Sequence, residues 1–154
     1  MNSLLSICLA FLLLTNFASA DMRSSVFAAI VERSGQISNC SLFSSMFLPD
    51  GIYESPVGSG WKIGPAAIQA DCEVWNSLIG PQGNGWYPGA LFSSESGNRT
   101  SFTLQIRTVS KGGCKTDIHG IVNVEYDIAN DKFGRWFHYY DSVWDHQDLY
   151  GTCT

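Results

Sequence analysis

Asp141 is the side chain whose type and surroundings best suit acid–base chemistry. It follows Tyr139 and Tyr140 near the end of a segment with a two-residue apolar period, and the flanking aromatic rings indicate burial. A carboxylic acid buried among apolar groups has a raised pKa and can exchange protons near neutral pH. The alternative interpretation places Asp141 at the end of a strand, in water and without a chemical role.

His119 is the candidate partner of Asp141. Residues 116–127 and 133–144 are expected to pair as strands, and in one register His119 faces Asp141 and forms an Asp–His pair. A slip of one residue turns His119 to the opposite face of the sheet. The residues alone leave both registers open. A Ser–His–Asp triad that includes Ser55 can also be assembled, but no nucleophile-elbow motif supports it.

Helical periodicity marks three segments that would position these groups. The first is residues 22–33, which Gly35 ends. The second is short, with Ser38 or Asn39 as its N-cap, and its apolar face consists of Leu42, Phe43, Met46 and Phe47. The third begins near Pro65 and ends at the glycine-rich residues 80–85, and its apolar stripe consists of Ile68, Cys72, Trp75 and Ile79.

Extended segments follow the helices. A turn at residues 49–51 precedes a short strand over residues 52–55. From Trp86 onward the apolar period is two, which predicts strands over residues 86–93, 101–110, 116–127 and 133–144. Helices followed by a series of antiparallel strands form an α+β fold with one core.

The N-terminal residues of the chain indicate export. Residues 1–20 contain an apolar core at 9–14 and a small-x-small cleavage site at 18–20, so they are expected to be a signal peptide. Cleavage leaves residues 21–154 as one domain in the extracellular medium, with no other segment suited to a membrane.

The formal net charge is −5 and no Lys/Arg cluster occurs, which argues against a nucleic-acid partner.

Cysteines and sequons agree with export. Cys8 would leave with the signal peptide, and an even number of cysteines remains, which suits an oxidising compartment. If residues 116–127 pair with 133–144, Cys114 lies near the final strand and the tail can return Cys153 to it. The pairs expected are then Cys40–Cys72 and Cys114–Cys153. No zinc-type spacing occurs, so no metal or cofactor is expected. The sequons place glycans at Asn39 and Asn98.

The segment Met46 to Leu78 carries a family resemblance. Its Glu54-Ser55-Pro56-Val57-Gly58 motif resembles the SnoaL-like and ketosteroid isomerase branch of the nuclear transport factor 2-like superfamily. The resemblance implies a cone in which a curved antiparallel sheet wraps around helices. Ser55 matches the position of the isomerase's catalytic aspartate, and Val122 that of its oxyanion aspartate. No tyrosine precedes Tyr53, so the oxyanion tyrosine is missing as well, and isomerase chemistry is not expected.

The resemblance also implies a site inside the cone. It places Asp141 toward the pocket, where it would share a face with Val122, and turns His119 outward. In this register His138 also points outward, because it is opposite in phase to Tyr139 and Asp141. The residues expected to contact a ligand are Tyr53, Ser55, Trp75, Val122 and Tyr139.

Three functions follow from this expected site. The first is a secreted domain that binds a small, mainly apolar molecule in the cone. The second is a SnoaL-like isomerase, cyclase or dehydratase that uses Asp141 as its acid or base. The third is a non-catalytic interaction domain that forms a homodimer through the outer face of the sheet.

Overall fold

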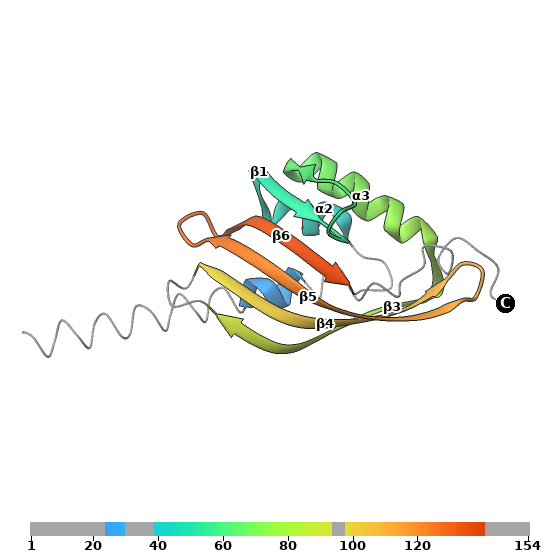
Figure 1. Cartoon of the computed structure of the whole chain (residues 1–154). Coiled ribbons are helices and arrows are strands. Elements are labelled where there is room, and N and C mark those ends of the chain that lie inside the picture. Colours follow the sequence, from blue (N-terminus) through green and yellow to red (C-terminus); the bar gives the residue numbers. More distant parts are fainter. Residues whose placement is uncertain (1–23, 30–38, 94–97, 141–154) are drawn as a thin grey trace, which may run out of the picture.

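The computed structural model describes residues 24–29, 39–93 and 98–140 (Figure 1). A helix over residues 24–29 is followed by the helix α2 (Cys40–Ser45) and the strand β1 (Phe47–Glu54). The short strand β2 (Lys62–Ile63) then leads into the long helix α3 (Gly64–Leu78). The remaining elements are the strands β3 (Ile79–Ser93), β4 (Arg99–Ser110), β5 (Lys115–Asp127) and β6 (Lys132–Tyr140).

The six strands form one sheet in the order β2-β1-β6-β5-β4-β3. All neighbours are antiparallel except β1 and β6, which run parallel. Figure 1 shows the long strands β3, β4 and β5 curving strongly, with α3 lying across the sheet near β1 and β6. The arrangement is the α+β architecture that the order of elements predicted.

The strand β4 separates the two faces of the sheet most clearly. Its residues alternate between exposed or half-buried and buried positions along the whole strand. Phe102, Leu104 and Ile106 point to the inner face and join the core, whereas Arg107 is exposed on the outer face. This period of two is the one that the sequence predicted for the second half of the chain.

Aromatic side chains dominate the core on the inner face. Trp136 of β6 is fully buried and makes edge-on contacts with Phe43 of α2, Phe102 and Phe133. Val26 and Ala29 of the first helix belong to the same core cluster. Edge-to-face rings pack with favourable quadrupole geometry, so this cluster joins the helices to the sheet.

The helix boundaries follow local chemistry. The Asn39 side-chain oxygen accepts the Leu42 backbone N–H at 2.9 Å, which confirms Asn39 as the N-cap of α2. Pro65 lies in the first turn of α3, as expected. The stripe on α3 is also present, with Ile68 and Cys72 buried and Trp75 half-buried.

Two strands begin several residues earlier than predicted. The strand β1 begins at Phe47 rather than at residue 52, because an irregularity in its pairing with β6 accommodates the residues expected to form a turn. A bulge of this kind tolerates proline, which cannot donate to the ladder. The strand β3 begins at Ile79, directly after α3, so the glycine-rich residues 80–85 end the helix but continue as a strand.

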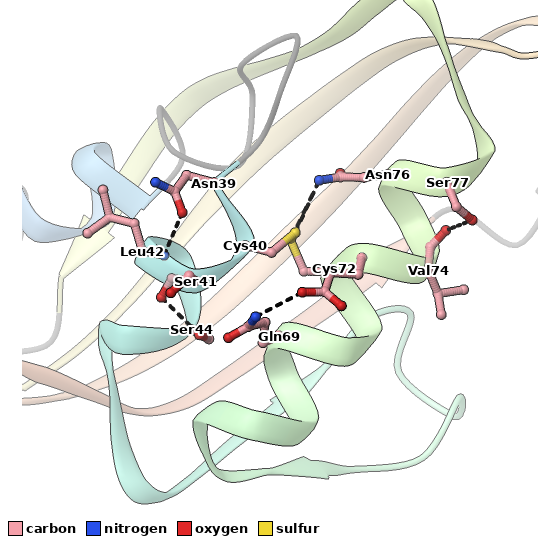
Figure 2. Close-up of a disulfide and its surroundings, with 11 residues drawn as sticks. Asn39, Cys40, Ser41, Leu42, Ser44, Gln69, Cys72, Val74, Asn76 and Ser77 are labelled. Carbon is pink, nitrogen blue, oxygen red and sulfur yellow. Dashed lines mark hydrogen bonds between the residues drawn. A yellow bond between two sulfur atoms is a disulfide. The ribbon is translucent and has the colours of Figure 1, made fainter.

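A disulfide joins the two labelled helices. Cys40 of α2 is bonded to Cys72 of α3 across a Cα–Cα distance of 5.5 Å, and this confirms one expected pair (Figure 2). The Asn76 side-chain amide donates to Cys40 Sγ at 3.1 Å. Cys114 is disulfide-bonded as well. Its expected partner, Cys153, lies outside the described residues, as does the expected signal peptide.

Among the described helices, none is both long enough and apolar enough to cross a membrane.

Candidate functional site

Polar side chains meet on the inner face at the end of β1. Ser55 directly follows β1, and its Oγ lies 2.7 Å from the hydroxyl of Tyr140 on β6. The same Oγ lies 3.4 Å from Nδ1 of His138. We call Ser55, His138 and Tyr140 the Ser55 cluster. Parallel pairing of β1 with β6 brings these residues together although more than eighty positions separate them in sequence.

Gly120 on β5 makes room for the imidazole of His138. It pairs with Tyr140 in the ladder, next to the Val122–His138 pair. A Cβ at Gly120 would lie 2.8 Å from His138 Nε2 and 2.4 Å from the Tyr139 carbonyl oxygen, so any side chain there would displace the ring or the strand. The imidazole is fully buried as a result.

Aromatic rings surround the buried imidazole. The Tyr140 ring lies 3.9 Å from the His138 ring, centroid to centroid, and the Trp86 ring lies at 6.1 Å. Trp86 is itself buried, whereas Ser55 and Tyr140 are half-buried. The cluster therefore runs from a fully buried imidazole to two half-buried residues that carry hydroxyl groups.

The chemistry available here is hydrogen bonding and proton exchange. Each hydroxyl can donate or accept, and the imidazole can do either according to its tautomer. An imidazole is also the side chain whose charge changes most readily near neutral pH. Such a group can orient the polar end of an otherwise apolar ligand, or act as a general acid or base if a reacting atom lies within reach.

The expected orientations of His138 and Tyr139 were wrong. His138 was expected to point outward, but its side chain is on the inner face and has no exposed surface. Tyr139 was expected to contact the ligand, but it pairs with Ile121 on the outer face and is 44% exposed. The cause is the register: Val122 pairs with His138, so β6 is one residue out of the expected phase.

The two residues proposed for acid–base chemistry are not brought together in the described structure. His119 lies on the outer face, where its side chain is 68% exposed and Nε2 is 3.4 Å from the carboxylate of Asp117. It takes no part in the Ser55 cluster. Asp141 lies outside the described residues, so its role stays a prediction.

The other residues expected to contact a ligand differ in how deeply they are buried. Tyr53 is 1% exposed, and its ring packs edge-on against Phe43 and Phe47 in the aromatic core. Val122 is fully buried beside the cluster, and half-buried Trp75 packs against the core from α3. Among these expected contacts, Ser55 is the one that belongs to the Ser55 cluster.

The outer face has two shallow grooves near the ends of β4, β5 and β6. The larger encloses about 540 Å³ and the smaller about 350 Å³, and both are lined by Glu125 and Arg135. Glu125 forms ion pairs with Arg99 at 3.6 Å and with Arg135 at 3.8 Å. These charges are solvated, so each pair contributes little stability.

The expected glycan sites both reach solvent. Asn39 is exposed, and half-buried Asn98 lines the larger outer groove. No group of three His, Cys, Asp or Glu side chains that could hold a metal occurs in the described ranges.

Solved structures with the same fold have low sequence identity to this chain. A putative polyketide cyclase from Xanthomonas campestris is 12% identical with a TM-score of 0.67, over 80% of this chain and 93% of that one. TerC co-crystallized with polyporic acid is 17% identical with a TM-score of 0.68, over 85% and 99% of the two chains. A Mycobacterium tuberculosis protein in complex with estradiol-17beta-hemisuccinate is 14% identical with a TM-score of 0.64, over 82% and 95%.

Other similar structures are described as having a cystatin-like fold and a ketosteroid isomerase-like protein fold. No protein-family model matches the sequence, and no curated protein matches it. The chain therefore shares its α+β fold with structures described as cystatin-like and ketosteroid isomerase-like, which is the kind of fold that the resemblance around Ser55 implied.

Proposed function

We propose that this chain, which has the fold of the putative polyketide cyclase and of the steroid-complexed protein described above, binds a small, mainly apolar molecule on the inner face of its sheet. The observation that carries the proposal is the Ser55 cluster. Ser55 Oγ and the Tyr140 hydroxyl lie 2.7 Å apart beside the buried His138 imidazole, among aromatic and aliphatic side chains. A few convergent polar groups in apolar surroundings are typical of sites for small molecules.

The polar end of the ligand would meet the Ser55 cluster. Its carbonyl oxygens would accept from the two hydroxyl groups, or its own hydroxyl groups would donate to them, while its apolar body would contact the half-buried rings of Trp75 and Tyr140. Polyporic acid and estradiol-17beta-hemisuccinate, the ligands of two similar structures, combine oxygen functions with an apolar body. They are therefore suitable first probes.

Two neighbouring tyrosines provide a matched test. Tyr140→Phe removes the hydroxyl that contacts Ser55, whereas Tyr139→Phe removes one on the outer face. Loss of one hydrogen bond from the site should weaken polyporic acid binding about threefold to tenfold. Quenching of tryptophan fluorescence measures the affinity. The proposal predicts a loss for Tyr140→Phe alone, and equal effects of the two variants would contradict it.

A second candidate function is acid–base catalysis with His138 in place of Asp141. It is favoured by the position of Ser55, which matches the isomerase's catalytic base and lies 3.4 Å from His138 Nδ1. His138→Gln should abolish any turnover found for the chain, and His119→Gln should leave it unchanged. Retained turnover in His138→Gln would exclude the imidazole as the base and leave Asp141 as the candidate.

Export, glycosylation and a homodimer complete the proposal. The Cys40–Cys72 disulfide agrees with an oxidising compartment. Intact mass spectrometry of the secreted protein, before and after glycosidase treatment, would test cleavage after residue 20 and both glycans. Analytical ultracentrifugation would test the homodimer.

A further inference from the structure

Glu54 is a buried acid next to the Ser55 cluster that takes no part in it. It follows the core residue Tyr53 in β1, and because successive strand residues point to opposite faces, its side chain points away from the inner face. Only 6% of the residue is exposed. Its Oε1 accepts the backbone N–H of Gly58 at 2.9 Å and that of Gly60 at 3.1 Å. A buried carboxylate needs such donors, because burial without them costs several kcal/mol.

The loop that Glu54 binds is open and is held by a small set of hydrogen bonds, of which Glu54 accepts two. Gly58 and Gly60 have φ angles of 98° and 93°, and a Cβ on either residue would meet nothing within 4 Å. Glycines in such conformations lose much backbone entropy on ordering, so an open loop of this kind requires tethers. Besides Glu54, the tethers include Val57 N–H to the His138 carbonyl oxygen at 2.8 Å and Ser59 N–H to the Pro56 carbonyl oxygen at 3.0 Å.

The tethers connect the loop directly to the Ser55 cluster. Ser55 is the first residue after Glu54, and the Val57 backbone N–H donates a hydrogen bond to the carbonyl oxygen of His138 itself. The position of Ser55 Oγ against the imidazole and the Tyr140 hydroxyl therefore depends on how the chain leaves β1. The Glu54 carboxylate holds the amides of Gly58 and Gly60, and so it restrains the course of the chain directly after β1.

We propose that Glu54 is a positioning residue for the site. By accepting two N–H groups of the loop 55–60, it holds Ser55 against His138 and Tyr140 before a ligand arrives. The inference rests on the proposed function for its effect on affinity, but the positioning itself is present without ligand. Preorganisation of this kind reduces the ordering cost that binding would otherwise include.

Glu54→Ala and Glu54→Gln test the inference, with Glu73→Ala as the control. Glu73 is exposed on α3, and its carboxylate accepts only from the Gln69 side chain at 2.8 Å among the hydrogen bonds described. Hydrogen exchange of the Gly58 and Gly60 amides reports the tether. The ¹⁵N chemical shifts of the His138 ring report whether Ser55 keeps its place. Titration with polyporic acid reports affinity.

Glu54→Ala should speed exchange at both amides and weaken polyporic acid binding, each by about tenfold. It should also change the His138 ring shifts. Glu54→Gln keeps one side-chain oxygen that can accept, so it should give smaller changes in the same direction. If the alanine variant does not fold, the glutamine variant alone tests whether Glu54 positions the site. Glu73→Ala should change none of the three.

Two results would overturn the inference. If exchange of the two amides is unchanged, Glu54 does not hold the loop. If exchange rises while the His138 shifts and the affinity stay constant, Glu54 stabilises the loop without positioning the site. Should the wild-type protein bind neither probe, the proposed function fails for them, and the His138 shifts of the ligand-free protein still decide the role of Glu54.

Discussion

At the scale of single residues, the site depends on a serine that is unsuited to proton transfer by itself. Ser55 has a neutral hydroxyl at the position where the resembled isomerases have a carboxylate. Its contacts with His138 and Tyr140 supply what the hydroxyl lacks: a titratable ring and a second hydroxyl. Three side chains, two of them from β6, thus meet at the position where the resembled isomerases have one carboxylate.

Gly120→Ala is expected to disrupt this arrangement. Its Cβ would lie 2.4 Å from the Tyr139 carbonyl oxygen and 2.8 Å from His138 Nε2, so strand and imidazole would both shift. Overpacking of this kind costs roughly 1–3 kcal/mol. Urea unfolding should show a loss of stability in that range together with changed His138 ring shifts.

Gly134→Ala is the matched control on the neighbouring strand. A Cβ there would meet its nearest atom, the Glu125 carbonyl oxygen, at 3.7 Å, which is an ordinary contact. Little loss of stability is expected. If Gly120→Ala loses no more stability in urea unfolding than Gly134→Ala does, His138 does not lie as close to the strand as the structure has it.

At the scale of elements, β6 decides what the site contains. It lies between β1 and β5, so its phase sets which residues reach the inner face. Its pairing with β5 shifts between Glu125 and Tyr126, and its burial pattern is less regular than that of β4. One extra residue in a strand reverses every side chain beyond it.

The Cys40–Cys72 bond is expected to stabilise the pair of helices against unfolding. The two cysteines are 32 residues apart, and closing a loop of that length stabilises by about 3–4 kcal/mol on the chain-entropy model. The double variant Cys40→Ala/Cys72→Ala should lose about that much in urea unfolding. Adding a reducing agent should then lower the free energy of unfolding less for the variant than for the wild type. A loss below about 1 kcal/mol would show that packing of α2 on α3 suffices.

The turn between β5 and β6 contains the one described acid with a clearly shifted pKa. The Asn130 side-chain and backbone N–H groups donate to the Asp127 carboxylate, each at 3.0 Å, and lower the pKa of this carboxyl below its usual range. A group with a lowered folded-state pKa contributes stability above its unfolded pKa of about 3.9, and loses it as the pH falls through the folded value.

Asn130→Ala should therefore be less stable than the wild type at neutral pH. The difference in free energy of unfolding should shrink below about pH 4. Urea unfolding at a series of pH values measures it. A difference that grows on acidification would mean that Asn130 stabilises the turn without favouring the carboxylate.

At the scale of the whole molecule, much of the fold could be predicted from the sequence. The period of two in β4 and the apolar stripe on α3 predicted elements that the structure confirms, and the motif around Ser55 predicted the kind of fold that similar structures share. Local rules suffice for these features, because each depends on residues close together in the chain.

The site followed less well, since it depends on pairing between distant strands. His138 and Tyr139 exchange faces because β6 is one residue out of the expected phase. The pairing with β5 skips Gly134, and a glycine within a strand often marks a bulge, so this residue was one available hint. Gly120 was a second. A glycine within a strand often marks a close approach, here of His138.

The most direct test of the inner-face site is a crystal structure of the complex with polyporic acid, which is also the ligand of a similar structure. The ligand should lie on the inner face, with one of its oxygen atoms within hydrogen-bond distance of Ser55 Oγ or the Tyr140 hydroxyl. Density for the ligand only in the outer grooves beside Arg135, with the Ser55 cluster unchanged, would contradict this expectation.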